Sequence, residues 1–231
     1  MYRTRAGGVA VSKATRSSLL QWATELERAD HDGVPLAARD PLPEAGSPGA
    51  AAIYADAALE CASAGFGAWA VCGDELLYVQ GEWSPEERRL LICDLELAAS
   101  TLGLVALQPE LACASLYSFT DNTVAMSAMR RLTPSTEAMQ AFTAARAAWL
   151  LEHGVTEAAE RITSAANLWA DMLSRGHVAA VEQQAARLQL RPRRVPVDQG
   201  WRDAVVAASH TREGHAGVAT PLARPHAAAS A

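Results

Sequence analysis

The sequence predicts an α/β fold in which a mixed sheet of five strands is flanked by helices. Short apolar runs and longer stretches of helical periodicity follow one another as strand, strand, strand, helix, strand, helix, helix, strand, helix. Hairpin spacing between the first three runs predicts that these strands are antiparallel. Half of the 231 residues are hydrophobic and alanine supplies much of that half, which favours a helix-rich core.

The five predicted strands cover residues 51–57, 65–72, 76–80, 114–120 and 157–163. The first is nearly all apolar, as expected for a strand that is buried on both faces. Gly73-Asp74 separates the second strand from the third. The fourth, ASLYSFT, is a second buried strand, and it ends at Asp121-Asn122.

Helices are predicted around these strands. Ser84-Pro85-Glu86-Glu87 supplies an N-cap, a proline at the first helical position and acids in the first turn. A helix is therefore expected from this point to residue 107. Further helices are predicted over residues 123–132, 135–153 and 165–175, and Gly154 ends the second of them.

The chain divides into three predicted segments. Residues 1–49 comprise an amphipathic helix at 17–29 and a linker rich in proline, glycine and acids. Residues 50–176 form the α/β domain. Residues 177–231 hold one more helix to about residue 190, then RPRRVPVD and an aperiodic tail, of which we expect the last ~20 residues to be disordered.

Composition excludes some classes of protein. The net charge of −6 argues against a strongly basic nucleic-acid binder, although an acidic metal site can still act on nucleic acid beside a small basic patch. The apolar stretch 50–72 contains acids and glycines, so it is not a membrane span. No sustained apolar segment follows the basic N-terminal residues, and we expect an intracellular protein of the cytoplasm or nucleus. The four cysteines have no metal-site spacing and are expected to be free thiols: Cys61, Cys72, Cys93 and Cys113.

Four acids in different contexts carry the functional prediction: Asp56, Glu96, Asp121 and Asp171. Three of them lie in apolar surroundings, where an unpartnered carboxylate is costly, and a divalent metal explains several such groups together. Asp56 lies in the first core strand and Asp121 at the end of the next strand after the helix. Glu96 should face the sheet from that helix, and Asp171 should return across the same edge. Convergence of the four would suit two-metal phosphodiester chemistry.

Each acid also has an ordinary explanation. Asp121 could start a helix, Glu96 could lie on a solvated helix face, and Asp171 could pair with Arg175 at i, i+4. The tryptophans Trp69, Trp83 and Trp169 are expected to pack in or around the core rather than to stack on bases. The arginines of the C-terminal segment could follow a nucleic-acid backbone, although no aromatic residues are interleaved with them: Arg187, Arg191, Arg193 and Arg194.

The motifs occur in the order YADA, GFGAW, GEW, LELAA, FTDN and NLWADMLSRG over residues 50–176. With these motifs the chain resembles a ribonuclease H domain of the retroelement type, and the pairing of TDN with N-x-x-AD-x-LSR is the most specific part of the match. Residues 1–49, with WATEL and GVPL, are similar to the connection between reverse transcriptase and ribonuclease H in such polyproteins. The details are closer to the tyrosine-recombinase retrotransposons (the DIRS group) than to retroviruses.

The resemblance implies a ribonuclease H-like fold and cleavage of the RNA strand of RNA–DNA hybrids. It implies two Mg²⁺ ions, with Mn²⁺ as a substitute, held by the four acids, of which Asp56 is shared by both ions. It also implies the reverse transcriptase domain of the same polyprotein as partner and no membrane. Residues near the motif acids would contact the substrate or support the ligands: Asn122, Asn167, Ser174 and Arg175.

The sequence departs from the family in two ways. The stretch ERITSAAN before Asp171 lacks the histidine that many relatives carry there, and the chain has no polymerase motif. A catalytically inactive ribonuclease H-like tether or interaction domain from a decayed element is therefore the alternative function. An integrase or transposase of the same fold fits less well, because those enzymes usually place a glutamate where this chain has Asp171.

Overall fold

The structure, a computed structural model, describes residues 2–3, 9–10, 50–60, 64–131, 134 and 136–210. The chain forms two compact units, one of residues 1–40 and 211–231 and the other of residues 41–210. In the first unit the described residues form an antiparallel pair, β1 (Tyr2–Arg3) with β2 (Val9–Ala10). The predicted helix at 17–29, the linker at 30–49 and the expected disorder at the C-terminal end lie outside the described residues.

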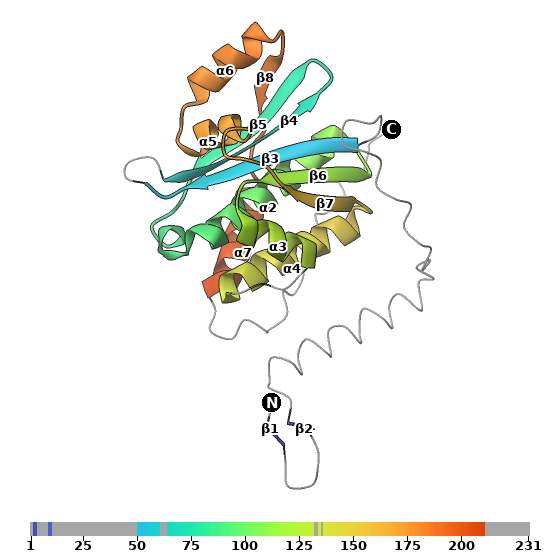
Figure 1. Ribbon diagram of the computed structural model, residues 1–231, viewed down its shortest axis with the longest axis vertical. Coiled ribbons are helices and arrows are strands. Elements are labelled where there is room, and N and C mark those ends of the chain that lie inside the picture. Colours follow the sequence, from blue (N-terminus) through green and yellow to red (C-terminus); the bar gives the residue numbers. More distant parts are fainter. Residues whose placement is uncertain are drawn as a thin grey trace. The chain divides into compact units, whose positions relative to one another are not determined.

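The second unit is built on a six-stranded sheet in the order β7-β6-β3-β4-β5-β8 (Figure 1). Its strands are β3 (Ala50–Ala58), β4 (Gly65–Cys72), β5 (Glu75–Glu82), β6 (Ser115–Thr120), β7 (Thr156–Arg161) and β8 (Arg191–Arg194). β3, β4 and β5 are antiparallel neighbours, whereas β6 runs parallel to β3 and β7 parallel to β6. The mixed sheet with three antiparallel leading strands is as predicted. This strand order, with three antiparallel strands followed by two parallel ones, is the ribonuclease H-like topology that the resemblance implied.

Helices cover the two faces of the sheet unequally. One face carries α2 (Ile92–Leu111), α3 (Thr123–Arg131), α4 (Glu137–Glu152) and α7 (Gln199–His210), and the other carries α5 (Leu168–Ser174) and α6 (Val178–Arg187) beside β4 and β5 (Figure 1). Among the described residues, α2 is the one helix long and apolar enough to span a membrane, and 78% of that apolar window is buried, as in a core helix. On the second face, over β3 and β6, the aromatic side chains Tyr54, Tyr117 and Phe119 are only partly buried.

The helix predicted from Ser84 begins later than expected. Ser84 and Glu87 do bond reciprocally, since Ser84 Oγ accepts from the Glu87 amide and the Glu87 carboxylate accepts from the Ser84 amide. They cap only a single 3₁₀ turn, η2 (Glu87–Arg89). The long helix α2 starts at Ile92, where the Asp94 carboxylate accepts the Leu91 amide. The N-cap predicted at Ser84 is present, but the long helix has a separate N-terminus seven residues later, where Asp94 accepts the Leu91 amide.

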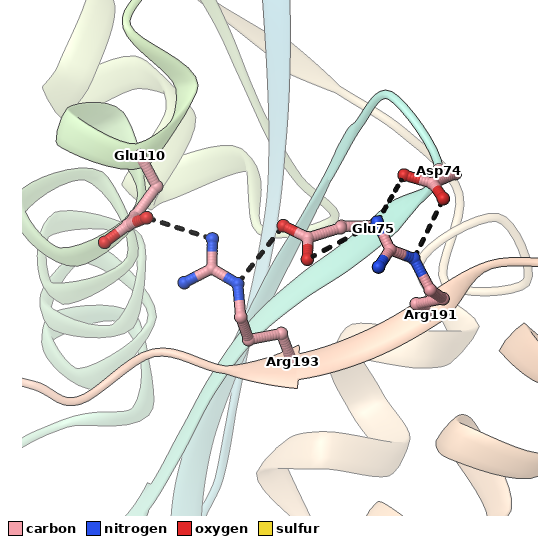
Figure 2. A network of polar contacts seen from close by, with 5 residues as sticks. All are labelled: Asp74, Glu75, Glu110, Arg191 and Arg193. Carbon is pink, nitrogen blue, oxygen red and sulfur yellow. Dashed lines mark hydrogen bonds and ion pairs between the residues drawn. The ribbon is translucent and has the colours of Figure 1, made fainter.

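The C-terminal segment contributes more to the unit than was predicted. β8 consists of the exposed residues RPRR and pairs in parallel with β5, with the Arg191 amide donating to Asp74 O and the Val195 amide to Tyr78 O. Arg191 pairs with Asp74 and Glu75, and Arg193 with Glu75 and with Glu110 of α2 (Figure 2). A strand of arginines and a proline has no apolar alternation, so backbone pairing and charge hold it at the sheet edge.

α7, which was also not predicted, packs against α4 through Trp201 and Val205, both buried. Its Arg202 forms a buried ion pair of 2.5 Å with Glu87 and lies 5.0 Å above the ring of Phe66. The compact unit therefore extends to residue 210, beyond the predicted boundary at 176.

Candidate metal centre

Asp56 and Asp121 extend from two neighbouring parallel strands. β3 and β6 are paired in register up to Tyr54 opposite Phe119, whose rings stack at 4.8 Å. Side chains alternate between the two faces of a strand, so residues two positions further on return to the same face. Asp56 and Asp121 each follow this aromatic pair by two positions. The register therefore sets the two carboxylates side by side on one face, with Asp56 inside β3 and Asp121 directly after β6, as the sequence predicted.

Glu96 reaches the same place from α2. It is 6% exposed, and its carboxylate accepts a hydrogen bond from the backbone amide of Ala57, next to Asp56. Its Oε2 atom has no hydrogen-bond partner in the part of the chain that the structure describes. Ligand oxygens of Asp56, Glu96 and Asp121 all lie within 4.8 Å of one another. Three of the four predicted acids are thus brought together.

The three carboxylates repel one another, and burial strengthens the effect. Burial raises the pKa of Asp56 to about 7; a hydrogen bond from Ser174 opposes this rise, and the charges of Asp121 and Asp171 add to it. Burial also raises the pKa of Glu96 to about 9, and the charges of Asp56 and Asp121 raise it further. The protein thus gathers anionic groups at a place where they are costly to ionise. A bound cation would remove that cost.

Asp171 lies beside this group but is not one of the three. It is in α5, its side chain is 39% exposed, and Arg175 Nε contacts its Oδ1 at 2.7 Å. Its negative charge nevertheless raises the pKa of both Asp56 and Glu96. The i, i+4 pair that the sequence allowed is therefore present, and Asp171 remains close enough to act on the cluster.

α5 lies against β4 because the strand has glycine at the contact. Gly67 is the register partner of Asp56. A Cβ at Gly67 would overlap Leu173 Cβ and approach the Ser174 amide nitrogen to 2.6 Å. This close approach lets the buried Ser174 Oγ donate a 2.6 Å hydrogen bond to Asp56 Oδ2. Ser174 therefore supports a candidate ligand and, at 1% exposed, is not placed to contact substrate.

The two asparagines fix the chain where acids enter the site. Asn167 is buried and its amide donates to Ala55 O at 2.9 Å, which ties the start of α5 to β3. Asn122 Oδ1 accepts from the amides of Val124 and Ala125 and so caps α3 directly after Asp121. Both geometries agree with supporting roles, and a contact with substrate stays a prediction.

Sequence reasoning missed two residues at the site. Ser164 Oγ donates to Asp121 Oδ2 at 2.5 Å, and Glu60 Oε2 accepts from Arg175 at 2.9 Å. Ser164 belongs to the stretch that was noted only for lacking a histidine, and a hydroxyl just past a strand at the same sheet edge was the available signal. Glu60 follows β3 in an ordinary loop position, and nothing in the sequence distinguishes it.

Among the described residues, no second group of acids, histidines or cysteines is placed to hold a metal ion. Cys72, Cys93 and Cys113 are free and half-buried, as expected for thiols without a pairing role, and Cys61 lies outside the described residues. Trp83 is 2% exposed, and the partly buried Trp69 stacks on Tyr54 at 4.2 Å. One face of Trp69 stacks on Tyr54 and the Trp169 ring lies 5.0 Å away, so Trp69 belongs to an aromatic cluster of the fold.

No protein-family model matches the sequence, and no curated protein matches it. Two solved structures resemble the fold. The N-terminal RNase H domain of a Mycobacterium tuberculosis protein, solved as a fusion with maltose-binding protein, is 18% identical at a TM-score of 0.45 and covers 54% of this chain and 95% of its own. RNase H1 from the halophilic archaeon Halobacterium salinarum is 16% identical at a TM-score of 0.45 and covers 57% and 99%. Likeness at this level concerns the fold, which the strand order already shows.

Proposed function

We propose that the chain is a divalent-metal-dependent endoribonuclease that cleaves the RNA strand of RNA–DNA hybrids. The observation that carries the proposal is the convergence of Asp56, Glu96 and Asp121 within 4.8 Å on a ribonuclease H-like sheet. Structural carboxylates are usually paired with cations or amides. Here the buried Glu96 Oε2 is left without a hydrogen-bond partner among the described residues, which is the state expected of a metal ligand.

The donor set fits magnesium. Asp56, Glu96 and Asp121 offer carboxylate oxygens, and Asp171 can supply a fourth carboxylate from α5. Mg²⁺ prefers such oxygens and keeps several waters, and Mn²⁺ accepts the same ligands. A pair of Mg²⁺ ions held there would position water and stabilise the leaving oxygen of an in-line phosphodiester hydrolysis.

The chain's own residues prepare the site for that chemistry. Ser174 orients Asp56, Ser164 orients Asp121, and the Ala57 amide orients Glu96. Since burial raises the pKa of both Asp56 and Glu96, cation binding near neutral pH should be accompanied by proton release from this pair. The four acids would repel a phosphate by themselves, so substrate can approach only after cations have neutralised them.

The choice of RNA–DNA hybrid rests on the motifs FTDN and NLWADMLSRG and their order along the chain. The same motifs support the finer part of the proposal, an origin in a retrotransposon polyprotein with a reverse transcriptase domain as partner. Arg191 and Arg193 of the edge strand β8 do not extend this argument, because they are paired with acids of the chain itself.

The test is cleavage of an end-labelled RNA–DNA hybrid by the full 231-residue protein in Mg²⁺ or Mn²⁺. Duplex DNA, duplex RNA and single-stranded RNA serve as alternative substrates. We expect the hybrid alone to be cut, and Asp56→Asn to abolish the cut. Asp203→Asn, which neutralises an exposed acid on α7, is the matched control and should cut like wild type.

Two results would contradict the proposal. Cleavage that persists in Asp56→Asn would show that another site or a contaminant is responsible. A folded protein that binds the cation but cuts none of the four substrates would favour the alternative, a catalytically inactive tether or interaction domain.

A further inference from the structure

Arg175 binds two carboxylates at the border of the candidate metal centre. Its Nε contacts Asp171 Oδ1 at 2.7 Å, and its Nη1 contacts Glu60 Oε2 at 2.9 Å. Asp171 belongs to α5, whereas Glu60 directly follows the strand that carries Asp56. One guanidinium therefore bridges a candidate ligand and a carboxylate that has no other assigned role.

The charge of Arg175 acts on the cluster as well as on its two partners. It lowers the pKa of Asp56, whereas the charges of Asp121 and Asp171 raise it. Arg175 thus already supplies, in part, the positive charge that a metal ion would bring. A cation that takes Asp171 as a ligand must share that carboxylate with the guanidinium or displace it.

We infer that Arg175 is a positioning residue that competes with a cation for Asp171, and that Glu60 holds the guanidinium when Asp171 turns to the cation. The inference rests on the proposed function, because it concerns the fourth carboxylate of the same metal centre. The three carboxylates Asp56, Glu96 and Asp121 can form the first cation site without Asp171. The competition therefore concerns a second, weaker site.

Because the three side chains are exposed, Arg175 can give up its contact with Asp171 at a small cost in free energy. The side chains of Arg175 and Asp171 are 37% and 39% exposed, and that of Glu60 is 79% exposed. Ion pairs between groups this accessible shift an equilibrium by about two- to fivefold, so a divalent ion can break the pair with Asp171. Glu60 and Asp171 both face the guanidinium, hence little movement is needed to pass it from shared to single contact.

The inference predicts that substitutions at Arg175 and at Glu60 have opposite effects on cation binding. Arg175→Gln removes the competitor and should tighten the weaker cation step by about two- to fivefold. Glu60→Gln leaves Arg175 with Asp171 as its remaining ion-pair partner among the described residues and should weaken the same step by a similar factor. A loss of structure would weaken binding in both variants.

The experiment counts bound Mn²⁺ from the loss of its free-ion paramagnetic resonance signal as it is titrated into the full chain. Wild type, Arg175→Gln, Glu60→Gln and the double variant are compared. If Glu60 acts by holding Arg175, its substitution should have no effect once Arg175 is gone, so the double variant should match Arg175→Gln. Thermal unfolding without metal checks that all four proteins are folded.

If Glu60→Gln weakens binding equally with and without Arg175, the two substitutions act independently. Both effects would then be explained by the change in net charge, and the inference would be overturned. An Arg175→Gln variant that binds the second ion no more tightly than wild type would overturn it as well. Failure of the metal centre itself looks different, since then no Mn²⁺ binds, or binding is unchanged in Asp56→Asn; failure of the nuclease function is read separately, from the cleavage assay. Tightening by Arg175→Gln should also vanish in an Asp171→Asn background.

Discussion

Ser174 Oγ donates a 2.6 Å hydrogen bond to Asp56 Oδ2, although the two residues lie 118 positions apart in the sequence. Asp56 is on the central strand β3 and Ser174 is the last residue of α5. The bond therefore joins the two ends of the ribonuclease H-like domain at its candidate metal centre. It also favours the ionised carboxylate, because it opposes the rise in pKa that burial causes.

Removing that bond should impair the site without unfolding it. In Ser174→Ala, Asp56 loses its donor, and its pKa should rise above the value of about 7. Cation binding and hybrid cleavage should then require a higher pH, and metal affinity at neutral pH should fall by about tenfold, as for other residues that support metal ligands. The measurement is the pH profile of Mn²⁺ binding, with cleavage as a second readout.

Ser164→Ala is the comparison for this prediction. It removes the hydroxyl that bonds Asp121 and leaves the donor to Asp56 in place. Metal affinity should fall in both variants, but the pH profile of Mn²⁺ binding should shift to higher pH in Ser174→Ala and not in Ser164→Ala. A profile for Ser174→Ala with an unmoved midpoint would show that the bond does not control Asp56.

The metal-free protein should lose stability as the pH rises. Folded-state pKa values of about 7 for Asp56 and about 9 for Glu96 lie above those of the unfolded chain, so the folded protein binds more protons between about pH 4 and 9. Stability from these groups is complete below pH 4 and is lost as the pH passes each folded pKa.

Urea unfolding in chelator at pH 5, 7 and 9 measures this slope. Glu96→Gln should flatten it and raise the stability at pH 9, because a neutral amide has no charge to lose. Added Mg²⁺ should restore most stability at the alkaline end, where the carboxylates are ionised. A wild-type stability that rises steadily from pH 5 to 9 in chelator would contradict the repulsion among these acids.

The arginine-rich strand β8 should stabilise the sheet edge rather than bind substrate. Arg191 and Arg193 are paired with Asp74, Glu75 and Glu110, so their charges are largely compensated within the protein (Figure 2). Arg193→Ala should change hybrid affinity by less than about twofold and leave its salt dependence unaltered, whereas loss of a phosphate contact lowers the salt slope by about 0.9. Fluorescence anisotropy with the non-cleaving Asp56→Asn protein gives both quantities. A lowered slope would assign Arg193 to the substrate.

The sequence alone predicted a residue's place in the fold where strand or helix periodicity determines that place. Asp56 and Asp121 were placed correctly because strand periodicity and strand order decide which residues share a sheet edge. β8 was not predicted because backbone pairing and ion pairs with acids remote in sequence hold it in place. Neither interaction produces an alternating pattern of apolar residues that can be recognised in the sequence. Ser164 and Glu60 were missed because an isolated polar residue in a loop acquires a role only through the residue that the fold brings to it.

Ser174 and Arg175 show how neighbours in one motif can diverge. Both were predicted as possible substrate contacts. Ser174 is instead buried against Asp56, whereas Arg175 forms ion pairs with Asp171 and Glu60. A helix rotates successive side chains by about 100°, so adjacent motif residues face different surroundings. Which surroundings they meet depends on how closely α5 can approach the sheet.

That approach depends on Gly67, and it provides the last prediction. In Gly67→Ala the added Cβ would overlap Leu173 Cβ and lie 2.6 Å from the Ser174 nitrogen, so α5 must move away from β4. Gly103→Ala makes a comparable overlap on the other face, 2.6 Å from Ala68 Cβ, where α2 meets the same strand.

Both variants should be destabilised by about 1–3 kcal/mol in urea unfolding, as overpacked cores are. At pH 7 and under conditions where both remain folded, Gly67→Ala should also lose about tenfold in Mn²⁺ affinity, because the bond from Ser174 to Asp56 is stretched. Equal metal affinities in the two variants would mean that the position of α5 does not control the metal centre.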